Sequence, residues 1–160
     1  MLKAILIGAL LAVSSPACAA SLSSTSAEDL GSVLSRKIGT NAKVSDLGCE
    51  IDGNALCHTL LNYSIRVVAI AKKPSQAPEL VAIYIPTPLD KTNLVLTMAV
   101  TSALLPEVET PRIRDAFYDL FKKAARLSRD PSVVIDQARL TVEMNEGRML
   151  VTIASSTLGE

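Results

Sequence analysis

The sequence predicts an α+β fold, with an antiparallel sheet of about five strands and helices packed on one face. Two stretches, 47–69 and 138–153, alternate apolar and polar residues around turn clusters, which is typical of β-hairpins. A third stretch, 111–128, repeats apolar residues at helical spacing. From these patterns we expect the order α-β-β-β-α-α-β-β.

The start of the chain is typical of a secretory signal peptide. Lys3 supplies a positive charge, an unbroken apolar run covers residues 4–13, and Ala17-Cys18-Ala19 forms a cleavage site. The apolar run is too short for a membrane-spanning helix, which needs about 20 apolar residues. These features predict export across a membrane.

Residues 1–19 are therefore expected to be removed, by cleavage after Ala19 or after Ala20. Residues 20–160 would then form a single globular α+β domain in the periplasm or medium of a bacterium. Two alternatives stay open, namely an uncleaved membrane anchor and a lipid attached at Cys18. After cleavage we expect no transmembrane span.

The first helix is expected over residues 27–38. Ser26 with Asp29, and likewise Thr25 with Glu28, has the spacing of a capping box. The residues that form its apolar stripe, and the glycine that ends it, are Leu30, Val33, Leu34, Ile38 and Gly39.

A disulfide is predicted in the first hairpin. Cys49 and Cys57 remain after cleavage, and two thiols in an oxidising compartment usually pair. A three-residue loop at 52–54 places Ile51 opposite Ala55, and so Cys49 opposite Cys57, with both apolar rows on one face. A redox pair is disfavoured, because the spacing is not C-x-x-C.

Two further strands are expected before the middle of the chain. Residues 55–69 continue the alternation as one strand, although 54–71 also fits a helix; the content of Val, Ile and Tyr favours the strand. Residues 80–85 are apolar on both faces, as in a central strand.

Two helices should follow. Residues 90–105 are apolar nearly all round, and we interpret them as a buried helix capped by Asp90 or Asn93, although 94–100 also fits a strand. Residues 111–128 are predicted as a second helix, with Thr110 as N-cap and proline at its first position.

A last hairpin places two apolar rows opposite each other, with Met144 facing Met149. This register requires either a tight turn at Glu146-Gly147 or a four-residue loop over 145–148. Residues 132–135 are expected to extend the first strand, with an irregularity near Asp136.

The composition excludes several classes of function. The chain has 16 basic and 16 acidic residues, which does not suit a nucleic-acid partner. It has no Trp and 3% aromatic residues, so surfaces for stacking bases or sugars are scarce. Hydrophobic residues make up 49%, which argues against disorder.

No catalytic, cofactor-binding or metal-binding motif is present. His58 is the one histidine and is interpreted as an ordinary strand residue on the outward row. The carboxylate pairs Glu107 with Glu109 and Glu50 with Asp52 are interpreted as solvated loop charges, with weak cation binding or acid–base work as the alternative. We expect no cofactor.

The function predicted from these observations is that of a small exported, non-enzymatic binding or adaptor protein acting through protein–protein contact. The partner would be another protein or a second copy of the chain. Lys122, Lys123 and Arg126 are a possible partner contact, although cations at a helix C-terminus also offset the helix dipole.

The alternative function is inhibition of a secreted or cell-wall hydrolase, with the loop at 52–54 entering the cleft of the enzyme. A hydrolase that uses scattered carboxylates is the least favoured hypothesis, because no motif supports it.

Overall fold

The computed structural model describes residues 22–126, 131–145 and 147–156. Within these ranges, three α-helices and a seven-stranded antiparallel sheet form an α+β fold. The predicted class is confirmed, and the sheet is larger than the five strands expected. The predicted signal peptide, residues 1–19, lies outside the described residues.

The elements follow one another along the chain as α1 (Leu30–Ile38), a 3-10 turn η1 (Gly39–Asn41), β1 (Val44–Asp52), β2 (Asn54–Leu61), β3 (Ile65–Ala71), β4 (Leu80–Pro86), α2 (Lys91–Leu104), α3 (Thr110–Ala125), β5 (Ser132–Ile135), β6 (Ala138–Asn145) and β7 (Arg148–Ser155). Across the sheet the strands lie in the order β1-β2-β3-β4-β7-β6-β5, so β1 and β5 are its edges.

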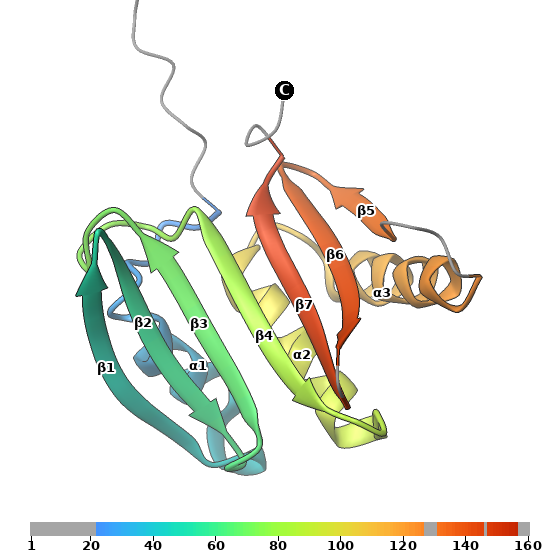
Figure 1. Cartoon of the computed structure of the whole chain (residues 1–160), viewed down its shortest axis with the longest axis horizontal. Coiled ribbons are helices and arrows are strands. Elements are labelled where there is room, and N and C mark those ends of the chain that lie inside the picture. Colours follow the sequence, from blue (N-terminus) through green and yellow to red (C-terminus); the bar gives the residue numbers. More distant parts are fainter. Residues whose placement is uncertain (1–21, 127–130, 146, 157–160) are drawn as a thin grey trace, which may run out of the picture.

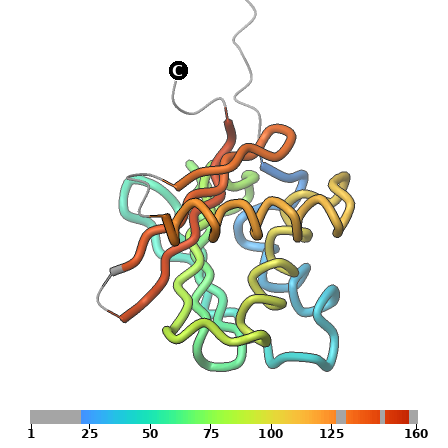
Figure 2. The backbone as a smooth tube through the Cα atoms, turned by 90° about the vertical axis from the view of Figure 1, so that its right-hand side faces the viewer, coloured from blue at the N-terminus to red at the C-terminus, as the bar shows by residue number. Residues whose placement is uncertain are grey.

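The helices and the sheet form two layers (Figure 1). Figure 2 shows α1, α2 and α3 on one side of the sheet, and no helix of the described ranges on the other side. The core lies between the layers, where inward residues such as Val67, Ile83 and Val151 are fully buried. From the helices, Leu34 and Phe117 complete this core at 0% and 1% exposure.

The first hairpin has the predicted register. Cys49 pairs with Cys57 and Ile51 pairs with Ala55, and the two sulfur atoms are bonded. Leu47 departs from the expected row, because the register shifts between Asp46 and Gly48 and leaves it as the extra residue of a bulge.

The stretch 55–69 forms two strands, where one was expected, and the helical alternative is wrong. Asn62 and Tyr63 have φ values of 48° and 59°, so the chain turns there and Leu61 pairs with Ile65. Paired residues lie on the same face of the sheet, so Leu61 and Ile65 keep the alternation of apolar and polar residues unbroken across the turn. For this reason the sequence pattern does not reveal the turn.

The stretch 132–145 is divided in the same way. Asp136 has a φ of 50°, and Ile135 pairs with Ala138, so β5 folds back onto β6 as a separate strand. The predicted extension of one strand is therefore wrong. These two turns account for the two additional strands.

All three predicted helices are present, but some of their ends differ from prediction. The first helix begins at Leu30, three residues later than expected, and the last ends at Ala125, three residues earlier than expected. Residues 91–104 are helical, and Oδ1 of Asp90 accepts a hydrogen bond of 2.7 Å from the backbone of Asn93. Thr110 is the first residue of α3 and not its N-cap, which is Glu109. Met144 pairs with Met149 as predicted, and pairing between residues 145 and 148 shows that the tight turn is the correct alternative.

Candidate functional site

The uncovered face of the sheet carries small side chains along its centre. Strand pairing aligns Val68 with Ala82 and Ala82 with Thr152, and the larger His58 lies beside Val68 at the end of this line on β2. On both sides of this line the outward side chains are larger, for example Ile70 on one side and Tyr84 on the other. This difference in side-chain size creates a recess on a face that helices do not cover.

The recess is a cleft of about 420 Å³ over β2, β3 and β4. Its floor contains Val68 and Ala82, which are 7% and 6% exposed although no helix of the described ranges lies over them. We call this recess the sheet cleft. It is lined by Leu56, His58, Arg66, Val68, Ile70, Ala82, Tyr84 and Arg148.

The charged groups of the sheet cleft are all basic. Arg66 lies on β3, and Arg148 reaches the cleft from β7, which neighbours β4. No carboxylate lines the cleft, and neither guanidinium forms an ion pair within the described ranges. An apolar recess with two unpaired guanidiniums suits a ligand that is both apolar and anionic.

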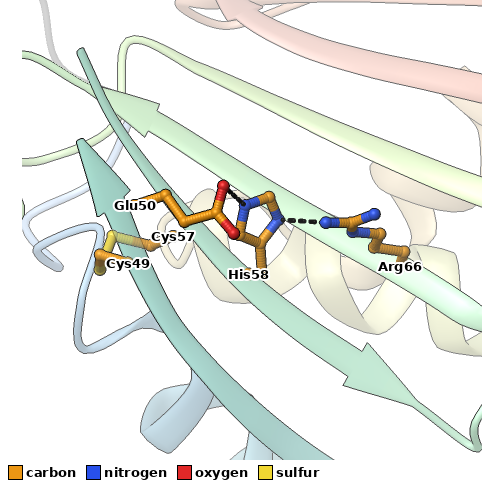
Figure 3. A network of polar contacts seen from close by, with 5 residues as sticks. All are labelled: Cys49, Glu50, Cys57, His58 and Arg66. Atoms are coloured by element: carbon orange, nitrogen blue, oxygen red, sulfur yellow. Dashed lines mark hydrogen bonds and ion pairs between the residues drawn. A yellow bond between two sulfur atoms is a disulfide. The ribbon is translucent and has the colours of Figure 1, made fainter. Parts of the chain in front are cut away.

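His58 connects Arg66 to the edge of the sheet (Figure 3). Nη2 of Arg66 lies 3.2 Å from Nδ1 of His58. Because a guanidinium group only donates hydrogen bonds, Nδ1 accepts, and the proton of the neutral ring is on Nε2. This Nε2 atom is buried and has no hydrogen-bond partner among the residues that the structure describes, and Oε2 of Glu50 lies 4.0 Å from it.

The disulfide stands beside this group of side chains. Cys49 and Cys57 directly precede Glu50 and His58 on their strands, so their side chains point to the opposite face. The bond holds β1 against β2, and thus keeps Glu50 beside His58. His58 lies on the outward row, as predicted, and is 8% exposed there.

The predicted basic contact lies elsewhere, at the end of α3 and on the other layer. Lys122 and Lys123 are exposed, and Nζ of Lys123 donates a 2.8 Å hydrogen bond to the carbonyl of Ser132. Arg126 is the C-cap residue of the helix. Lys123 therefore ties α3 to β5, while a partner at this position stays a prediction.

The two carboxylate pairs singled out in the sequence lie on different elements, one at the end of β1 and the other before α3. Glu107 and Glu109 are exposed in the loop before α3, and Asp52 lies at the hairpin tip, away from them in the chain. Glu107 lines a second cleft of about 380 Å³ with Asp136, whose carboxylate pairs with Arg112 at 2.8 Å. Within the described ranges no group of three or more His, Cys, Asp and Glu side chains could hold a metal ion.

Comparison with protein-family models, curated proteins and solved structures gave no match. Among the helices that the structure describes, none is both long and apolar enough to cross a membrane.

Proposed function

We propose that the chain is a non-enzymatic binding protein that acts through protein–protein contact, and that the uncovered sheet face is its binding surface. The observation that carries this proposal is the sheet cleft, an apolar recess in the middle of a face over which none of the described helices lies (Figure 2). Exposed apolar surface of this kind often marks a site of contact with a partner.

The composition of the face supports this proposal. Its outward positions include Leu56, Ile70 and Leu80, which are all partly exposed, whereas an antiparallel sheet facing only water usually carries polar residues there. A second layer of protein would bury these side chains. The partner would thus take the place that helices take on the opposite face.

We further propose that the protein works outside the cytoplasm, in the periplasm or the medium of a bacterium. The disulfide between Cys49 and Cys57 supports this location, because such bonds persist in oxidising compartments. The N-terminal pattern of a signal peptide points to the same location.

Site-specific photo-cross-linking tests the proposed surface. Tyr84 lies in the sheet cleft and Tyr118 lies on α3, and they are 36% and 67% exposed. Replacing each in turn by benzoylphenylalanine in exporting cells should give a discrete protein adduct at position 84 and none at position 118. The proposal is rejected if position 84 gives no adduct, or the same adducts as position 118.

One observation favours the inhibitor as a second candidate. Ile51, at the tip of the disulfide-braced hairpin, is 74% exposed, so a large apolar side chain projects from this tip into solvent. We propose that, in this role, Ile51 would enter the cleft of a hydrolase. Cell-wall hydrolases should then be slowed by the chain and not by its Ile51→Asp variant; unchanged rates across a panel would eliminate this function.

A further inference from the structure

We propose that the sheet cleft binds an extended protein segment in which an acidic side chain stands next to an apolar one. Arg66 and Arg148 would bind the carboxylate, and the apolar side chain would rest on Val68 and Ala82. This inference rests on the proposed function and adds the chemistry of the partner.

Charge complementarity identifies the anionic part of the ligand. Two guanidiniums face one cleft, and no carboxylate within the described ranges neutralises either of them. Arg66 uses one nitrogen on His58, which leaves further N–H donors for a carboxylate. Hydrogen bonds between a guanidinium and a carboxylate are charge-assisted, and they are stronger than hydrogen bonds between neutral groups.

His58 has the role of a positioning residue. Its Nδ1 atom holds Nη2 of Arg66, and this restricts the guanidinium before any ligand arrives. A side chain that is already ordered loses less conformational entropy on binding. On the far side of the ring, Glu50 is exposed and 4.0 Å away, so a small movement would let it accept the unused Nε2 proton.

The shape of the site favours a protein segment over a membrane surface. Val68 and Ala82 lie at the bottom of a recess enclosed by larger side chains, among them Ile70 and Tyr84. A single apolar side chain can reach this floor, whereas the charged headgroups of a flat bilayer would stop at the rim. A flexible segment can place its carboxylate and its apolar side chain independently.

Selection from a random peptide library displayed on phage, against the full oxidised chain, tests the proposal. The recovered peptides should be enriched in Asp or Glu next to Leu, Ile, Val or Phe. A synthetic copy of the best peptide, with its acid changed to the amide, should bind about tenfold more weakly or worse, as expected for a charge-assisted contact. An empty selection, or one without acidic residues, overturns the proposal.

Matched double variants locate the contact. Replacing Arg66 and Arg148 by Gln should weaken binding of the acidic peptide at least about tenfold. Replacing Arg36 and Lys91, exposed residues of α1 and α2, by Gln removes the same charge from the helix layer and should leave the affinity unchanged. Equal losses in both variants would show a general charge effect and contradict the assignment.

The role of His58 has its own measurement. His58→Phe should lower the ratio between the affinities for the acid and amide peptides, because Arg66 loses its support. The affinity for the amide peptide alone should not change. If both affinities fall together, His58 acts only on the packing of the face, and the positioning role is wrong.

Two results separate this inference from the function on which it rests. Adducts at position 84 together with amide and acid peptides of equal affinity would keep the binding surface and reject the carboxylate. Binding to vesicles of phosphatidylglycerol that is lost in the Arg66 and Arg148 double variant, without any selected peptide, would assign the cleft to a membrane and overturn the inference.

Discussion

The two faces of the sheet differ in what their side chains do. On the helix-covered face, Val67, Ile83 and Val151 are fully buried and pack against the helices. On the uncovered face, the corresponding positions Val68 and Ala82 form the floor of a cleft with basic residues at its rim. We therefore expect the stability of the fold to depend mainly on the helix-covered face, while the uncovered face can bind a ligand.

The largest expected effect is the loss of an aromatic ring from the covered side. Phe117 is 1% exposed, so Phe117→Ala should lower the free energy of unfolding by about 3–5 kcal/mol in a urea titration. Tyr84→Ala, in the sheet cleft, should cost far less because its ring is already 36% exposed. Similar losses for the two variants would contradict the division between the faces.

The disulfide should have the next largest effect. Replacing both Cys49 and Cys57 by Ser releases a loop of about nine residues, which should lower the free energy of unfolding by about 2.6 kcal/mol on chain entropy. The measurement is urea unfolding of the oxidised chain beside the double variant. Reduction of the parent protein should reproduce the loss, and an unchanged midpoint would argue against it.

Val67 and Val68 are neighbours on β3, and the same substitution at each allows a direct comparison of the two faces of the sheet. Val67 points to the helices and Val68 to the sheet cleft, so Val→Ala removes the same atoms from opposite faces. We expect a loss of about 2–3 kcal/mol for Val67→Ala and about 1 kcal/mol for Val68→Ala. Parallel thermal and urea unfolding measures both, and the reverse order would remove the distinction.

The smallest effect on stability is expected at the rim. The double variant of Arg66 and Arg148 to Gln should unfold within about 0.5 kcal/mol of the parent protein, because both side chains are exposed and form no ion pair within the described ranges. A calorimetric scan checks this. A large loss would mean that these residues serve the fold, and their binding data would need another explanation.

Turns that contain glycine could be predicted, and turns that do not were missed. Gly53 and Gly147, with φ values of 72° and 81°, mark the two hairpins that the sequence predicts. Asn62 and Asp136 adopt similar backbone angles without a glycine, and there the apolar alternation hides the turn. For this reason the sheet has two strands more than expected.

The sheet cleft was beyond local sequence patterns for a different reason. The cleft requires β4 to lie beside β7, and this brings Arg148 near side chains that are more than sixty positions earlier in the chain. The spacing of apolar residues along the sequence does not indicate which distant strands become neighbours. A signal did exist, since outward positions such as Leu56, Val68 and Ile70 are apolar where polar residues are usual. The register of the disulfide hairpin, by contrast, followed from a short loop and could be predicted.

The bond between Cys49 and Cys57 has a consequence for how two copies of the chain can meet. β1 is an edge strand, and such strands are prone to being exchanged between molecules. Because β1 is covalently joined to β2, it cannot leave to replace its counterpart in another copy while the bond is intact. The oxidised protein therefore cannot form an entangled dimer by exchanging β1 without β2, whereas pairing of this edge with a further strand remains open to it.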